Sequence, residues 1–331
     1  MKRVKVFAPG TVANIGCGFD VMGLTLDGVG DVVAVTLYDD KDEFDRHASA
    51  SGNAFVSTAC IVSVKNNSSE KLPETAAKNV VTPAVSAMAE AFLEKSGSKE
   101  ALYMEIEIID KIRPGSGIGS SAASSAAAVY ALNHLLGHPF SEVKLVDFAM
   151  EGERLISGTA HADNVGPAIL GGIVFIRGYN PTDLIKLPVP DDFYCTVVHP
   201  HITVSTKEAR DILPANVSRK DAIRQWGNVG GFVAGLLLDD MELLGRSVED
   251  VIAEPYRKKF IPGYDALKSR LLEAGMLGVN IAGSGPFVFA LSKSADMAEK
   301  GRKIMASHFS DQGVDFETYL TQIGMTGARI V

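Results

Sequence analysis

The segment that most constrains the fold of this chain runs from Arg113 to Ala128 and reads RPGSGIGSSAASSAAA. It follows an alternating apolar run at residues 102–109, LYMEIEII, which predicts a strand. The alanines and apolar residues that begin at Ser120 predict a helix ending at Gly137. Glycines between a strand and a helix let the backbone adopt positive φ and approach a ligand closely. We therefore expect a sharp glycine turn directly before the first turn of a helix.

A helix that begins at such a turn can bind an anion. Its first four backbone N–H groups have no partner within the helix, and the helix dipole adds partial positive charge there. Together with a glycine backbone, these groups form a cradle for phosphate. Hydroxyls that suit phosphate oxygens or Mg²⁺ follow at the start of the helix, on Ser120, Ser121, Ser124 and Ser125. The alternative is an Ala/Ser-rich helix packed tightly behind a flexible turn.

Two familiar phosphate-binding patterns do not describe this turn. The Walker pattern requires a lysine after its last glycine, whereas Ser120 follows Gly119 here. The dinucleotide pattern G-x-G-x-x-G is met at Gly115 and Gly117 but fails at Ser120. The segment therefore predicts a phosphate site of another class.

The composition and the order of elements indicate two α+β domains. With 331 residues, 46% of them hydrophobic, the chain can bury two cores at about 150 residues per domain. Strands and helices mix without regular alternation, which favours α+β layers. Three prolines within residues 178–190 mark a boundary between domains at 1–178 and 179–331. The last strand pair is expected to be DFETYLTQI with GARIV, and Trp226 is expected in the core.

Charge and cysteine content argue against several classes of protein. A net charge of −8 disfavours binding to nucleic acid, which requires a basic surface. No apolar run is long enough to span a bilayer, and the first residues lack the unbroken apolar stretch of a signal peptide. Three widely spaced cysteines form neither a disulfide framework nor a zinc pattern. We expect a cytoplasmic protein with reduced thiols and without membrane or nucleic-acid partners.

Several motifs together resemble one family. PGSGIGSSAASSAA is similar to the signature P-x-x-x-G-L-G-S-S-A-A of the galactokinase, homoserine kinase, mevalonate kinase and phosphomevalonate kinase (GHMP kinase) superfamily, with Ile118 in place of leucine. VNIAGSGPFVFAL resembles the third motif of that superfamily. Segments that resemble the homoserine kinases in particular are VKVFAPGTVANIGCGFDVMGLTL, EGERLISGTAHADNVGPAILGG, STKEAR and EPYR. The resemblance spans nearly the whole chain, with the motifs in the expected order.

The resemblance implies a fold and a reaction. The fold is the two-domain α+β GHMP kinase form, with an N-terminal half like domain 2 of ribosomal protein S5 and a ferredoxin-like C-terminal half. The active site is expected in the cleft between the halves. The reaction is transfer of a phosphoryl group from ATP, with Mg²⁺, to the side-chain hydroxyl of L-homoserine in threonine biosynthesis. A homodimer is a family expectation. Alternatives on the same fold are a mevalonate-type kinase and a non-catalytic regulator.

The resemblance also implies a nucleotide site. The ATP phosphates are expected at the glycine turn of residues 115–119 and at Gly283 to Gly285, with Asn79 near the adenine. Ser121 and Glu153 are the expected ligands of Mg²⁺. The full set expected to bind ATP is Asn79, Pro114, Gly115, Ser116, Gly117, Ile118, Gly119, Ser120, Ser121, Ala122, Ala123, Ser124, Gly283, Ser284 and Gly285.

The acceptor site follows from the chemistry of homoserine and from the same resemblance. Homoserine carries an ammonium, a carboxylate and a hydroxyl, so its site should offer arginines to the carboxylate and acidic or amide groups to the ammonium. The resemblance supplies Arg210 and Arg257 for the carboxylate. The groups that it places around the amine and hydroxyl are Asn14, Asp20, Asp163 and Asn164. With Glu153, Asp163 and Asn164 are the catalytic candidates, and the choice between an aspartate base and an orienting amide stays open.

One further pattern is left without a function. His199 and His201 alternate on a predicted strand, so their side chains share a face. Zinc sites in proteins use at least three protein ligands, and the sequence shows no third ligand beside this pair. We therefore expect no metal site at these two histidines.

Overall fold

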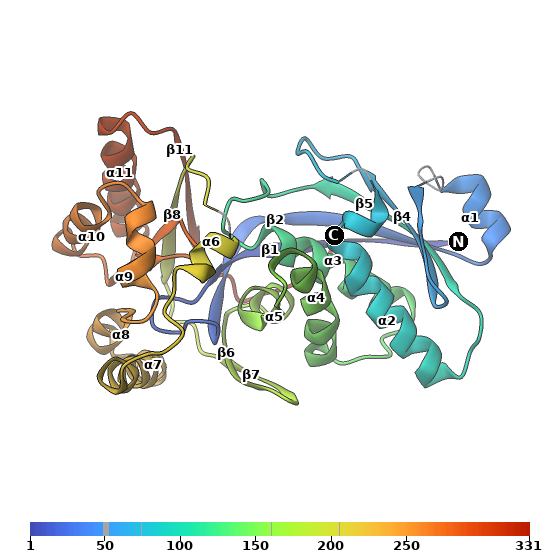
Figure 1. Ribbon diagram of the computed structural model, residues 1–331, viewed down its shortest axis with the longest axis horizontal. Helices are drawn as coiled ribbons and strands as arrows, with labels where there is room; N and C mark the ends of the chain where they lie inside the picture. The colour runs from blue at the N-terminus through green and yellow to red at the C-terminus, as the bar shows by residue number, and fades with distance from the viewer. Residues whose placement is uncertain (49–52, 74, 160, 205) are drawn as a thin grey trace.

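The computed structural model describes residues 1–48, 53–73, 75–159, 161–204 and 206–331. Ala160 and Ser205 fall within two of the motifs quoted above and lie outside the described residues. The described chain forms two sheets with their own helices, arranged along the long axis of the molecule (Figure 1).

The first half of the chain supplies most of the larger sheet. The strands of this sheet are β1 (Lys2–Ala13), β2 (Met22–Tyr38), β3 (Phe55–Val56), β4 (Cys60–Asn66), β5 (Leu102–Asp110), β6 (Ile173–Tyr179), β7 (Thr182–Leu187) and β12 (Arg329–Ile330). The strand order is β12-β1-β2-β5-β4-β3, and β6 pairs with both β2 and β7. Strand β2 is long enough to change partner, pairing first with β6 and further along with β5.

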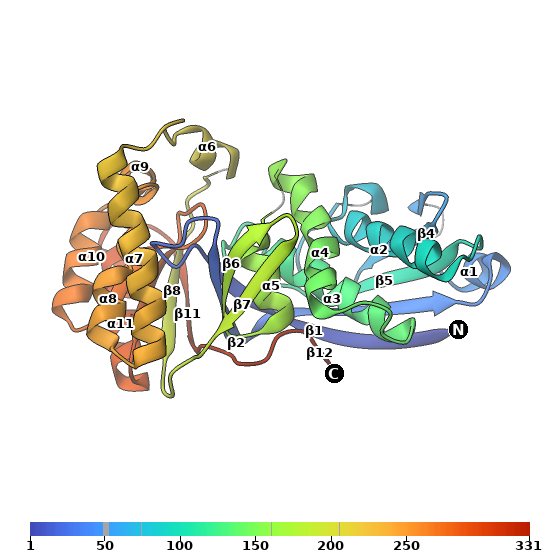
Figure 2. The same ribbon diagram turned by 90° about the horizontal axis from the view of Figure 1, so that it is seen from below.

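Helices cover one face of this sheet, as the two views show (Figures 1 and 2). They are α2 (Val81–Ser96), α3 (Ser120–Leu135), α4 (Glu142–Ser157) and α5 (Ala162–Leu170). Helix α3 packs against β1 and β2 and contacts the other three helices, and its small residues Ala122, Ala123 and Ala126 are fully buried. Ser141 is the N-cap of α4, because its Oγ accepts a hydrogen bond from the backbone N–H of Lys144.

The C-terminal half forms a sheet of four antiparallel strands in the order β11-β8-β10-β9. These strands are β8 (Tyr194–Pro200), β9 (Gly278–Ile281), β10 (Val288–Ser292) and β11 (Phe316–Gln322). The helices are α6 (Thr206–Asp211), α7 (Arg219–Leu238), α8 (Met241–Ser247), α9 (Glu254–Arg257), α10 (Tyr264–Glu273) and α11 (Ala295–Asp311). In chain order, helices lie between β8 and β9 and again between β10 and β11. With the strand order of the sheet, this gives the expected ferredoxin-like topology. None of the helices in the described part of the chain is long and apolar enough to cross a membrane.

The structure corrects two expectations. β11 and β12 do not pair with each other, since β11 lies beside β8 and β12 beside β1. Trp226 is 68% exposed, because α7 buries the face that carries Phe232 and Leu236. A short helix that follows β2, α1 (Lys41–His47), is capped by the side chain of Asp40.

The change from one sheet to the other falls later than the prolines suggested. Strand β7 pairs with β6 along residues 182–187 and so belongs to the larger sheet, whereas the boundary at 178/179 assigned these residues to the second half. The first strand of the smaller sheet begins at Tyr194. We therefore infer that the domain boundary lies between Leu187 and Tyr194.

Candidate active site

The glycine turn and α3 meet as the sequence predicted. Gly115, Gly117 and Gly119 all have positive φ, at +76°, +63° and +67°. Helix α3 begins at Ser120, directly after Gly119, whose left-handed conformation ends the turn. The first turn of α3 therefore follows a backbone that only glycine adopts without strain. This arrangement provides the N–H cradle that an anion requires.

A buried ion pair holds the start of α3 in place. Lys111 Nζ lies 2.7 Å from Asp31 Oδ2, and both side chains are almost fully buried. Lys111 also donates to the backbone carbonyl and hydroxyl of Ser120. Asp31 accepts from the hydroxyl of Ser124 and from the backbone N–H of Ile112. The hydroxyls of Ser120 and Ser124 are thus engaged with the protein, which leaves Ser121 as the better candidate to meet a ligand.

Two alanine substitutions in the turn separate backbone strain from steric contact. Gly115→Ala should cost about 1–2 kcal/mol of unfolding free energy, because it carries positive φ and an added Cβ there meets no atom within 4 Å. Gly117→Ala should cost about 1–3 kcal/mol more, because its Cβ would lie 1.8 Å from Cδ2 of Phe287. Urea denaturation of the two variants measures the difference. Equal losses would show that Phe287 does not pack against the turn.

The turn opens on a cleft of about 410 Å³. The expected site residues that line it are Asn14, Asp20, Asn79, Pro114, Gly115, Gly117, Gly119, Ser120, Ser121, Ser124, Glu153, Asp163, Asn164, Arg210, Arg257, Gly283, Ser284 and Gly285. The side chains of Ser116, Ile118, Ala122 and Ala123 are instead buried, so these four residues can offer a ligand only their backbone. Sequence reasoning missed three lysines in the lining, Lys71, Lys78 and Lys111.

Glu153 and Ser121 are neighbours in the cleft, on α4 and α3. Burial raises the pKa of Glu153, and the nearby hydroxyl of Ser121 and the charge of Lys111 only partly oppose that rise. A buried carboxylate beside a hydroxyl is a suitable oxygen pair for Mg²⁺, whose charge would offset the burial.

Asp163 and Asn164 open α5 and face the cleft with different chemistry. Burial, with the charges of Asp20 and Glu153, raises the pKa of Asp163 to about 8, so its carboxyl group is mostly protonated at neutral pH. Asn164 Oδ1 accepts a hydrogen bond of 2.8 Å from the hydroxyl of Thr11. This bond engages the amide oxygen, whereas the Nδ2 group has no hydrogen-bond partner among the described residues.

The two arginines and Asp20 meet at one end of the cleft. Arg210 makes a two-pronged ion pair with Asp20, with 3.2 Å between each nitrogen and its oxygen. Arg210 Nε is buried and has no hydrogen-bond partner among the described residues. Arg257 is buried and donates to the backbone carbonyls of Ala209 and Gly283. This end of the cleft therefore offers cationic groups beside a carboxylate.

Asn14 lines this end of the cleft and hydrogen-bonds the backbone there through both ends of its amide group. Its Oδ1 accepts from the backbone N–H of Asp20, and its Nδ2 donates to the carbonyl of Gly283. Asn14 and Asp20 both have positive φ, at 71° and 59°. The phenyl ring of Phe19, which sequence reasoning missed, lies under the Arg257 guanidinium at 5.1 Å.

Comparisons with known proteins agree with this geometry. The family model described as GHMP kinases N terminal domain matches residues 80–172, and that described as GHMP kinases C terminal matches residues 232–311. The homoserine kinase of Chlorobium phaeobacteroides (strain BS1) is 43% identical over 333 aligned residues that cover 100% of both chains.

Solved structures give the same result. The crystal structure of homoserine kinase from Cytophaga hutchinsonii is 42% identical, with a TM-score of 0.85, and covers 100% of this chain and 98% of that chain. The L. major mevalonate kinase, solved in complex with R-mevalonate, is 16% identical with a TM-score of 0.62 and coverage of 96% for both chains. At that identity the second likeness shows the fold alone.

Proposed function

The chain belongs to the GHMP kinase family, with homoserine kinases as its full-length relatives, and from this premise we propose that it phosphorylates the side-chain hydroxyl of L-homoserine. ATP is the phosphoryl donor of such a kinase. One observation carries the assignment of the substrate: Arg210, Arg257 and Asp20 line the same cleft as the glycine turn. A carboxylate and an ammonium on one small molecule are what this charge pattern would bind.

The phosphates of ATP would lie against the turn of residues 115–119 and the start of α3. Backbone N–H groups and the helix dipole bind the polyphosphate there, and Lys71 and Lys78 add positive charge to the cleft wall. Mg²⁺, held by Ser121 and Glu153, would neutralise charge on the transferred phosphoryl group. Fixed positions for both reactants account for most of the catalysis.

At the acceptor end, Arg210 and Arg257 would bind the substrate carboxylate and Asp20 the ammonium. A substrate carboxylate would replace Asp20 as a partner of the Arg210 guanidinium. It would also contact Nε of Arg210, which has no hydrogen-bond partner among the described residues. The homoserine oxygen would then attack the γ-phosphorus, the bond from that phosphorus to the bridging oxygen would break, and ADP would leave, while the proton of the hydroxyl would be released to solvent water.

We infer that Asn164 orients the acceptor hydroxyl and that Asp163 is not the base. Asn164 Nδ2 is available to donate to the hydroxyl oxygen, whereas Asp163 is mostly protonated near pH 7. Asn164→Ala should lower kcat by about 10²-fold, and Asp163→Asn, which keeps the neutral form, should lower it less. Steady-state assays of both variants across the pH range measure these changes in kcat. Abolished turnover in Asp163→Asn, with Asn164→Ala near normal, would reverse the two roles.

The raised pKa of Asp163 also predicts how stability depends on pH. The folded protein holds a proton that the unfolded chain releases near its ordinary pKa of 3.8. The free energy of unfolding should therefore fall as pH rises from about 3.8 to about 8 and level off above that range. Asp163→Asn should lack this part of the fall and be more stable than the parent at about pH 8. Urea unfolding at several pH values measures both, and parallel pH curves for the two proteins would contradict the shifted pKa.

The substrate assignment is tested by assaying the protein with ATP and, in turn, L-homoserine, mevalonate, galactose and shikimate. We expect ADP and O-phosphohomoserine with L-homoserine, and far lower turnover with the others, which lack an ammonium. Phosphorylation of mevalonate in place of homoserine would favour the mevalonate-type alternative. Tight ATP binding without turnover on any acceptor would favour a regulator, although the glycine turn, Ser121 and Glu153 all line the cleft.

We also propose that the protein is a homodimer through α7. This helix exposes Ile223, Trp226 and Leu237. Its first turn holds Arg219 and Lys220 with one acidic residue, Asp221, so it carries a net positive charge, whereas Asp239 and Asp240 follow its end. Two copies crossing antiparallel would pair the basic start of one helix with the acidic end of the other. Light scattering of the purified protein gives the molar mass that checks this.

A further inference from the structure

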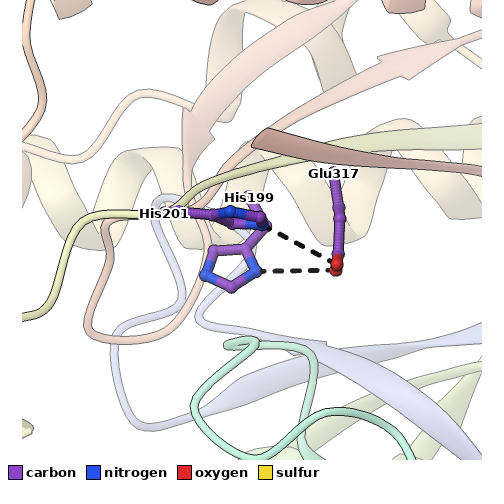
Figure 3. A group of neighbouring side chains, drawn as sticks. All are labelled: His199, His201 and Glu317. Carbon is purple, nitrogen blue, oxygen red and sulfur yellow. Dashed lines mark ion pairs between the residues drawn. The ribbon is translucent and has the colours of Figure 1, made fainter. Parts of the chain in front are cut away.

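His199, His201 and Glu317 form a cluster at the edge of the second sheet, and none of the three lines the cleft described above. His199 on β8 and Glu317 on β11 are directly paired across the antiparallel strands. His201 follows the end of β8, where its backbone N–H bonds the carbonyl of Asp315. Figure 3 shows both imidazole rings facing the Glu317 carboxylate. Pairing of β8 with β11 supplies the third group that the sequence alone did not show.

The distances within this cluster suit a shared ion. Nδ1 of His199 lies 4.0 Å from Oε2 of Glu317, and Nε2 of His201 lies 3.7 Å from Oε1. The three ligand atoms all lie within 4.8 Å of one another. Bonds of about 2.0–2.2 Å to one tetrahedral ion would bring such atoms to roughly 3.4 Å apart. Small side-chain movements are enough to close that gap.

A second observation points to a ligand at this place. Nδ1 of His199 is buried and has no hydrogen-bond partner among the described residues, although buried polar atoms are normally paired. The His199 side chain is only 6% exposed. Burial and the nearby His201 lower the pKa of His199 to about 4, so the ring is in the neutral form that binds metals.

The Glu317 carboxylate is also suited to act as a metal ligand. Partial burial raises the pKa of Glu317, but hydrogen bonds from Tyr319 and Arg113 outweigh it and the pKa lies below its ordinary range. Tyr319 donates to Oε2 at 2.9 Å. Hydrogen bonds of this kind orient metal ligands in known sites.

We propose that His199, His201 and Glu317 bind a divalent transition metal ion of the zinc class. Two imidazoles and one carboxylate are a common donor set for zinc, and such a set leaves further positions open to water. Mg²⁺ prefers oxygen ligands, so this site is separate from the magnesium site proposed at Ser121 and Glu153.

Arg113 competes with the metal at this site. Its Nη1 lies 3.2 Å from Glu317 Oε1 and 3.4 Å from His201 Nε2. A metal ion that takes both atoms must displace the guanidinium. Arg113 is separated from the glycine turn only by Pro114, so its release would change the contacts at one end of that turn.

Zinc binding to the chelator-dialysed full-length protein, measured against a chromophoric zinc indicator in the absence of ATP, tests the proposal. The parent protein should bind one equivalent of Zn²⁺. His201→Ala and Glu317→Gln should each weaken this binding by at least about 10-fold. Arg113→Ala should instead tighten it by about 5-fold, because the competing cation is gone. Opposite signs for these variants are not expected from a general loss of structure.

His138→Ala is the matched control, because His134 and His138 form another histidine pair, with Nδ1 and Nε2 3.1 Å apart. This variant should keep the equivalent of zinc. Zinc should also raise the Tm of the parent and of His138→Ala but not that of Glu317→Gln. A parent protein that binds no equivalent, or zinc lost in His138→Ala and retained in His201→Ala, would overturn the proposal. Neither outcome depends on kinase activity.

Discussion

Glu153→Gln is expected to lower kcat by about 10²- to 10³-fold while the protein remains folded. Glutamine keeps the shape of the side chain and removes the negative charge proposed to hold Mg²⁺. Because burial disfavours the charged form of Glu153, the variant should unfold at the same urea concentration as the parent or at a higher one. Steady-state kinetics at saturating Mg²⁺ and ATP, together with urea denaturation, measure both effects.

Glu151→Gln provides the matched control for this prediction. Glu151 lies on the same helix but pairs with Arg154 at the surface, so the variant should retain normal kcat. Ser121→Ala should give a smaller loss than Glu153→Gln, because it removes a neutral ligand. Near-normal turnover in Glu153→Gln would show that the metal is held elsewhere.

Arg210→Ala is expected to raise KM for L-homoserine by about 10- to 100-fold, with little change in KM for ATP. The substitution removes a guanidinium that would bind the substrate carboxylate. It also leaves Asp20 without its two-pronged partner at the same end of the cleft. Initial rates measured over a matrix of homoserine and ATP concentrations separate the two constants.

Arg224→Ala controls for the loss of an arginine. Arg224 pairs with Glu249 on the exposed side of α7, so this variant should leave both KM values unchanged. If Arg210→Ala changed only KM for ATP, the arginine would belong to the nucleotide site. In Arg210→Lys, KM for L-homoserine should rise less than in Arg210→Ala, because lysine restores the charge but not the two-pronged geometry.

The parts of the fold set by neighbouring residues could be read from the sequence. The glycine turn and the alanine-rich helix α3 depend on local backbone preference, and each stands where the pattern predicted. The four-stranded sheet was implied by the family resemblance and is confirmed.

Features that depend on distant segments were missed. Lys111 lines the cleft because it meets Asp31, a partner 80 residues away that no local pattern indicates. Glu317 joins His199 only through strand pairing. Trp226 was expected in the core on hydrophobicity alone, but its place on α7 turns it outward. Burial also shifts Asp163 toward its protonated form, and the sequence does not reveal burial.

The closing strand β12 has a consequence for how the molecule is made. Val6 and Phe7 of β1 pair with Ile330 and Arg329, which are synthesised much later than β1. This edge of the larger sheet therefore stays uncovered while the residues between them are being translated. Deleting residues 329–331 should leave that edge exposed and make the newly made chain more prone to aggregate.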